Sequence, residues 1–120
     1  MRGLTAIVAD ASPARLRSTL MLALAQAALG GRARLLLDGK AVGAVRPPVG
    51  EPGDEGYAAA GLPILAELLD EALNAGVRVI LCQSGLVLVG ASVAEFDPRL
   101  EQGGMIGIMA DLGEDRLLVV

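Results

Sequence analysis

Short apolar runs alternate with helical segments along the first 82 residues, and this order constrains the fold more than any other feature. The runs at 4–9, 33–37 and 77–82 have the length and the Leu, Ile, Val and Ala content of strands buried in a sheet. Segments 13–29 and 62–75 between them have helical spacing of apolar residues. Strand–helix alternation is typical of a parallel sheet covered on both faces. We therefore predict an α/β fold, a three-layer α/β/α domain with a mostly parallel sheet of about five strands.

Capping residues mark where the first helix begins and ends. Ser12 is a favourable N-cap and Pro13 suits the first helical position, while Gly30-Gly31 supplies a left-handed stop. Segment 84–89 fits a strand by β-propensity or a helix capped by Ser84, and we favour the helix. The remaining predicted elements are a helical turn at 93–96, a weak strand at 99–103, a helix at 105–112 and a final buried strand at 115–120.

The chain of 120 residues predicts a single domain, 1–120. Residues 40–45 read as a turn with a weakly structured extension. Between residues 46 and 56 the sequence has three prolines and three glycines among acidic residues. We expect a flexible loop at 46–60, with 46–56 as its least ordered part.

The composition excludes several kinds of chemistry. The chain has no His and one Cys, so it offers neither a Ser-His-Asp triad nor a Cys-His pair. One Cys cannot by itself hold zinc, haem or an iron–sulfur cluster, and it forms no intrachain disulfide. We expect no metal and no cofactor.

The charge and hydropathy of the chain limit the kinds of partner that we expect it to bind. Ten Lys and Arg against fourteen Asp and Glu give a net charge of −4, and only 2% of residues are aromatic, which argues against nucleic-acid binding. No apolar run reaches the length of a membrane span, and the N-terminus lacks the apolar region of a signal peptide, so we expect a cytoplasmic protein with no membrane partner. A hydrophobic content of 53% in so small a domain favours a homo-oligomer that covers surplus apolar surface.

Candidate functional residues follow the predicted strands. In parallel sheets, ligands bind beyond the carboxyl ends of the strands. Asp38 and Gly39 follow the second strand. The residues that we select at this edge are Cys82 as the reactive group and, as ligand-binding candidates, Asp10, Ser12, Gln83, Ser84 and Gly85.

The run Val79-Ile80-Leu81-Cys82-Gln83-Ser84-Gly85 resembles the third strand and cysteine loop of the DsrE/DsrF-like sulfur-relay family. The segments 38–42, 103–105 and 110–112 agree with that family in order and spacing, whereas the Pro- and Gly-rich stretch 46–56 departs from it. The resemblance implies a small homo-oligomer, trimer first and dimer second. It also implies that Cys82 carries sulfur as a persulfide, as a carrier or sulfurtransferase, with a sulfur donor or acceptor protein as partner.

The chemistry of a thiol agrees with this role. Sulfur transfer needs a nucleophilic thiolate and neither histidine nor metal. Free N–H groups of Gln83, Ser84 and Gly85 at a helix start favour an anion at Cys82. Three alternatives stay open: Cys82 is a buried small hydrophobe, the protein is a non-catalytic oligomeric module that binds a small ligand or partner protein at the carboxyl edge, or its role is purely structural.

Overall fold

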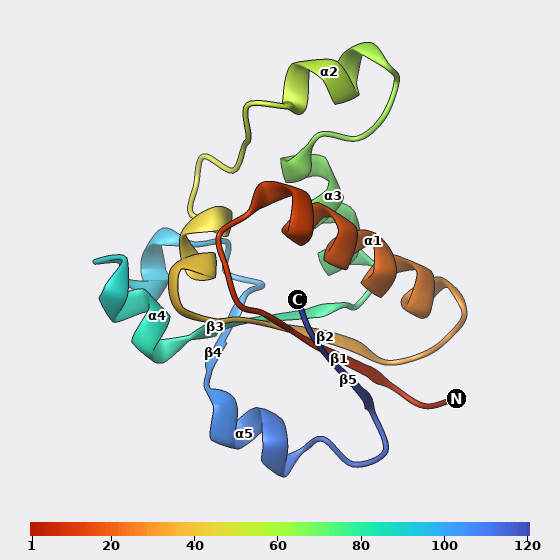
Figure 1. Cartoon of the computed structure of the whole chain (residues 1–120), viewed down its shortest axis with the longest axis vertical. Coiled ribbons are helices and arrows are strands. Elements are labelled where there is room, and N and C mark those ends of the chain that lie inside the picture. Colours follow the sequence, from red (N-terminus) through yellow and green to blue (C-terminus); the bar gives the residue numbers. More distant parts are fainter.

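A computed structural model describes all residues, 1–120, and its centre is a five-stranded, all-parallel sheet with the strand order β4-β3-β2-β1-β5. Figure 1 shows α1 and α3 over one face of this sheet and α5 over the other. The strands are β1 (Leu4–Val8), β2 (Ala33–Leu37), β3 (Arg78–Cys82), β4 (Glu101–Gly103) and β5 (Arg116–Val119). The helices are α1 (Pro13–Ala28), α2 (Asp54–Ala59), α3 (Leu65–Asn74), α4 (Gln83–Leu88) and α5 (Met105–Ala110), with 3₁₀ helices η1 (Gly39–Val45) and η2 (Val93–Glu95).

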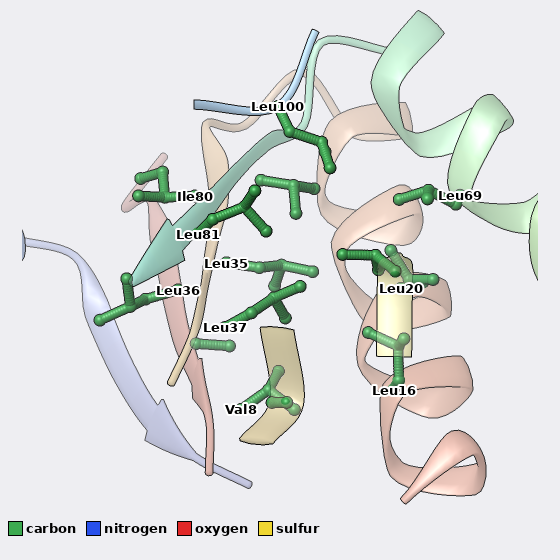
Figure 2. Close-up of a cluster of buried hydrophobic side chains, with 14 of the residues drawn as sticks. Val8, Leu16, Leu20, Leu35, Leu36, Leu37, Leu69, Ile80, Leu81 and Leu100 are labelled. Atoms are coloured by element: carbon green, nitrogen blue, oxygen red, sulfur yellow. The ribbon is translucent and has the colours of Figure 1, made fainter. Parts of the chain in front are cut away.

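The main core lies between the sheet and the α1–α3 layer. Alternate strand residues point to opposite faces. Figure 2 shows Leu35 and Leu81 directed towards α1 and α3, and Leu36 on the opposite face of the sheet. All three are fully buried, which explains why these strands read as continuous apolar runs. The prediction of a three-layer α/β/α fold is confirmed, and the sheet is parallel throughout.

Local signals place α1 correctly. The Ser12 hydroxyl accepts a hydrogen bond of 3.3 Å from the N–H of Arg15, and Pro13 is the first helical residue. The segment after β3 is a helix, α4, as favoured, and the turn, weak strand and helix predicted after residue 92 are also present.

Three predictions about single elements are wrong. Segment 40–45 is not weakly structured, because Ala41, Val42 and Val45 bury η1 against the core. The predicted loop 46–60 contains helix α2. The last strand is not buried: every residue of β5 is exposed, since it is an edge strand with β1 on one side only.

No helix in the structure has both the length and the apolar character that crossing a bilayer requires.

Candidate functional site

Cys82 lies at the junction of β3 and α4, at the carboxyl edge of the sheet. It is the last residue of β3 and is in register with Gly103, at the end of β4. The chain then turns directly into α4 at Gln83. This short connection is held by close packing on η1: a Cβ on Gly85 would lie 2.6 Å from Val42 Cγ2 and 2.7 Å from the carbonyl oxygen of Gly39. Only glycine fits at position 85, so Gly85 fixes where α4 begins relative to the thiol.

The thiol borders an open cavity and is otherwise covered. Cys82 is 6% exposed, and its Sγ lies 3.1 Å from the Oγ of Ser84. The cavity measures about 540 Å³ and runs from the β3–α4 junction to the start of α5. Its lining residues are Asp38, Cys82, Gln83, Ser84, Gly103, Gly104, Met105, Ile106 and Gly107.

The Ser84 hydroxyl is the side-chain group that contacts the sulfur of Cys82. An O–H that donates to a thiolate makes a charge-assisted hydrogen bond and stabilises the anion. Backbone N–H groups in the first turn of a helix have no partner within that helix, but none of those in α4 donates to the Cys82 side chain, so the expected contribution of the Gln83, Ser84 and Gly85 amides is not seen as hydrogen bonds. Because α4 has only six residues, its macrodipole is short, and the Ser84 hydroxyl is the side-chain group within hydrogen-bond distance of the sulfur. The arrangement places the sulfur at the wall of an open cavity that has both polar and apolar lining residues.

The structure brings together some of the predicted site residues and separates others. Cys82, Gln83 and Ser84 line one cavity, and Gly85 packs behind it on η1. Asp10 and Ser12 are not among the residues that line this cavity. The Asp10 carboxylate accepts the N–H of Ser12 at 2.8 Å and lies 3.5 Å from the Arg15 guanidinium, so both residues serve the start of α1.

Several residues that line this cavity were not among the candidates selected from the sequence. Asp38 lines the cavity beside Cys82 because β2 and β3 are neighbours in the sheet. The backbone of Gly103, Gly104 and Gly107 forms the opposite wall, at the start of α5. Two features of the sequence could have identified these residues. Asp38 follows a predicted strand, and Gly103-Gly104 precede a predicted helix.

A buried polar network crosses the α5 face of the sheet. The Nε of Arg34 donates to Thr5 Oγ1 at 2.8 Å, and Thr5 donates to Asp115 Oδ2 at 2.8 Å. Arg32 donates to the same carboxylate at 2.7 Å. Burial raises the pKa of the Asp115 carboxyl, but the hydrogen bonds from Thr5 and Arg32 and the charges of Arg32 and Arg34 outweigh it, so this pKa lies below its ordinary value. The network ties β1, β2 and the start of β5 together under α5.

No group of three or more His, Cys, Asp or Glu side chains is arranged to hold a metal ion. The polar groups around Cys82 are a hydroxyl, an amide, a carboxylate and backbone groups, which include both hydrogen-bond donors and acceptors. Such a set suits hydrogen bonding to a small ligand.

Comparisons with known proteins identify solved structures that share this fold. No protein-family model and no curated protein sequence matches the chain. Among solved structures, the YchN protein of E. coli is similar over 100% of both chains, with a TM-score of 0.78 and 22% sequence identity. MTH1491 of Methanobacterium thermoautotrophicum, described as a protein of unknown function, is similar over 99% of this chain and 98% of its own, with a TM-score of 0.62 and 13% identity. The chain therefore has a DsrE/YchN-like fold.

Proposed function

We propose that this protein is a cytoplasmic sulfur carrier of the DsrE/DsrF-like type, which holds sulfur as a persulfide on Cys82. The observation that carries the proposal is the position of the Cys82 Sγ, beside the Ser84 hydroxyl at 3.1 Å and at the wall of an open cavity. The resemblance of residues 79–85 to the cysteine loop of that family supports it. So does the DsrE/YchN-like fold, which presents the loop at the carboxyl edge of the sheet.

The transfer needs only the groups present and a sulfane-sulfur donor. The Cys82 thiolate attacks the outer sulfur of a donor persulfide, forming a new S–S bond while the donor's S–S bond breaks. The donor leaves as its thiolate, and Cys82 becomes a persulfide, Cys–S–SH, whose outer S–H then releases its proton to water to give the persulfide anion. The step moves a neutral sulfur atom with no net oxidation or reduction. The hydroxyl of Ser84 then stabilises the persulfide anion by the same kind of hydrogen bond that stabilises the thiolate.

Mass spectrometry of the intact chain tests the proposal. After incubation with inorganic polysulfide, the folded protein should gain the mass of one sulfur atom, and a reductant should remove it. Because Cys82 is the only thiol, the Cys82→Ser variant should gain nothing while keeping its fold. A wild-type chain that stays unmodified when folded, but gains sulfur once it is unfolded, contradicts the proposal.

The burial of Cys82 favours one alternative, a non-catalytic module that binds a small ligand or a partner protein at the same edge. With 6% of the residue exposed, the thiol is reached only from the cavity side. A binding module needs the cavity near Ser84 and does not need a reactive sulfur. Rapid alkylation of the folded chain near neutral pH separates the two, since only a carrier requires it.

We also propose that the chain assembles into a closed homo-oligomer, a trimer first and a dimer second. The support is its exposed apolar surface. Leu22 and Leu29 at α1 and Leu118 of β5 line one apolar depression of about 260 Å³. Each is between 38% and 72% exposed, and contiguous apolar surface of this kind is commonly covered by another subunit.

A further inference from the structure

Asp38 and Cys82 lie next to each other where β2 and β3 end. Leu37 and Leu81, the residues before them, are register partners in these neighbouring parallel strands. Asp38 and Cys82 both have extended backbone angles, so each continues its strand by one position. Alternation then directs both side chains to the face opposite to that of Leu81, which points towards α1 and α3 (Figure 2). Because neighbouring strands are about 5 Å apart, the carboxylate and the thiol border the same part of the cavity.

The carboxylate of Asp38 has no partner within the chain. It takes part in no ion pair, and neither does the exposed ammonium group of Lys40, two residues further on. Asp38 precedes η1, but its side chain does not cap that helix. Asp10, which also follows a strand, differs in this respect because it accepts the N–H of Ser12. The contacts within the chain therefore give the Asp38 side chain no structural role.

Asp38 is also the only charged residue that lines the cavity. Arg34 and Arg78 project from the same face of β2 and β3 but lie four positions earlier, about 13 Å away at about 3.3 Å per residue. Both are paired with carboxylates, Arg34 with Asp115 and Arg78 with Glu101. The field inside the cavity therefore comes mainly from one unpaired negative charge, in a chain whose net charge is −4.

We propose that Asp38 determines the charge of the sulfur donor that Cys82 accepts: the cavity favours a sulfane sulfur with a cationic group beside it and disfavours anionic donors. The inference rests on the proposed function and specifies its substrate class. As the outer sulfur of the donor approaches Cys82, a neighbouring ammonium or guanidinium group is attracted by Asp38, whereas a carboxylate or sulfonate group is repelled. A cysteine persulfide beside a Lys or Arg of a partner protein and the persulfide of a small aminothiol share this chemistry.

The sulfur step is the one given above. The Cys82 thiolate attacks the outer sulfur of the donor persulfide, a new S–S bond forms, the donor's S–S bond breaks, and the donor leaves as its thiolate. No external oxidant or reductant takes part. Asp38 acts on the charge beside the reacting sulfur and on no reacting atom, so it is a positioning residue for the donor.

Methanethiosulfonate reagents of different charge test the field at the thiol without any persulfide. The thiolate attacks the divalent sulfur of each reagent, an S–S bond forms, and methanesulfinate leaves. The cationic trimethylammonium-ethyl reagent should modify the folded wild type faster than the anionic sulfonatoethyl reagent. In Asp38→Asn the ratio of these two rates should fall by about tenfold. Because both rates depend on the same thiolate, their ratio reports only the charge near the sulfur.

Two controls separate the local charge from other effects. Asp10→Asn has the same net charge as Asp38→Asn but lies outside the cavity, so its ratio should equal that of the wild type. In the wild type itself, a salt concentration of about 1 M should lower the ratio, because salt screens the carboxylate.

Short peptides identify the source of the cationic group. Each has one cysteine, activated as its 2-pyridyl disulfide, between either two lysines or two glutamates. Discrimination between these peptides as well as between the small reagents assigns the donor to a partner protein, whereas discrimination between the small reagents alone assigns it to a small aminothiol. In both cases Asp38→Asn should abolish the discrimination.

The possible results separate this inference from the sulfur-carrier function. Equal rates for the cationic and the anionic small reagent in the wild type, or a ratio that Asp38→Asn leaves unchanged, overturns the inference. Loading by inorganic polysulfide, which is an anion, should be faster in Asp38→Asn than in the wild type. If polysulfide loads neither chain while the reagent ratio behaves as expected, only the sulfur-carrier function is overturned.

Discussion

The Ser84 hydroxyl is the side chain that we expect to control the reactivity of Cys82, because its Oγ lies 3.1 Å from the sulfur. A hydrogen bond to a charged group contributes about 1.5–3 kcal/mol, so its removal should destabilise the thiolate relative to the thiol. Ser84→Ala should therefore slow alkylation of the folded chain at neutral pH by about tenfold, a factor that corresponds to about 1.4 kcal/mol. Ser18→Ala, at an exposed position of α1, is the matched control. Equal rates for Ser84→Ala and the wild type contradict this role.

The lowered pKa of the Asp115 carboxyl predicts how the free energy of unfolding depends on pH. Its pKa is lower in the folded chain than in the unfolded one, where it is about 3.9. A carboxylate of this kind stabilises the fold above that unfolded pKa, and its contribution disappears as the pH falls through the folded pKa. Asp115→Asn also leaves the buried Arg34 without its countercharge, so we expect a loss of about 3 kcal/mol at neutral pH.

Denaturant unfolding of the wild type and Asp115→Asn between pH 7 and pH 2 measures this effect. The difference in unfolding free energy should be largest at neutral pH and should shrink on acidification. Glu114→Gln, next to it and exposed, should behave like the wild type at every pH. A difference between wild type and Asp115→Asn that grows as the pH falls would be opposite to the expected sign.

The contact between α4 and η1 is the element-scale feature on which the site depends. At Gly85 a new Cβ would meet Val42 Cγ2 at 2.6 Å and the Gly39 carbonyl oxygen at 2.7 Å. We expect Gly85→Ala to lower the unfolding free energy by about 1–3 kcal/mol, since overpacking forces the backbone to shift. Gly56→Ala, in open space within α2, should instead be neutral or stabilise the chain by about 0.5–1 kcal/mol. Thermal unfolding of the two variants makes the comparison.

Helix α2 is attached to the domain by few contacts. None of its residues is buried, and the guanidinium of Arg17 stacks over the Tyr57 ring at 3.4 Å from its centroid. Asp54 also accepts the N–H of Leu65 at 3.1 Å. Segments with little buried apolar surface open locally at low cost, so we expect limited proteolysis to cut first between residues 46 and 60. Tyr57→Ala should speed this cleavage and Tyr57→Phe should not, because phenylalanine keeps the ring that Arg17 contacts. First cleavage elsewhere contradicts the prediction.

At the scale of the whole molecule, the exposed edge of the sheet predicts self-association. Every residue of β5 is exposed, and an open, apolar edge strand is a ready surface for pairing or packing with another chain. Light scattering at micromolar concentration should give the mass of three chains, or of two. Leu118→Glu should shift the mass towards one chain, whereas Val93→Glu, on η2, should not. A wild-type mass of one chain rules out the proposed assembly at that concentration.

The sequence alone determined the fold class, because the signals for its elements are local. Apolar run length, the Ser12-Pro13 helix start and the glycines after α1 and α3 each act within a few residues, and they placed the three central strands and the main helices correctly. The junction of Cys82 with α4 was foreseen for the same reason.

Only the tertiary structure decided what surrounds the thiol and what stays exposed. The position of β4 beside β3 brings Gly103 and Gly104 to Cys82, and the position of β2 brings Asp38, whereas Asp10 stays with α1. The edge position of β5 exposes a strand whose composition predicted burial. Strand order and helix coverage depend on contacts between residues far apart in the chain, which no local pattern of apolar residues specifies.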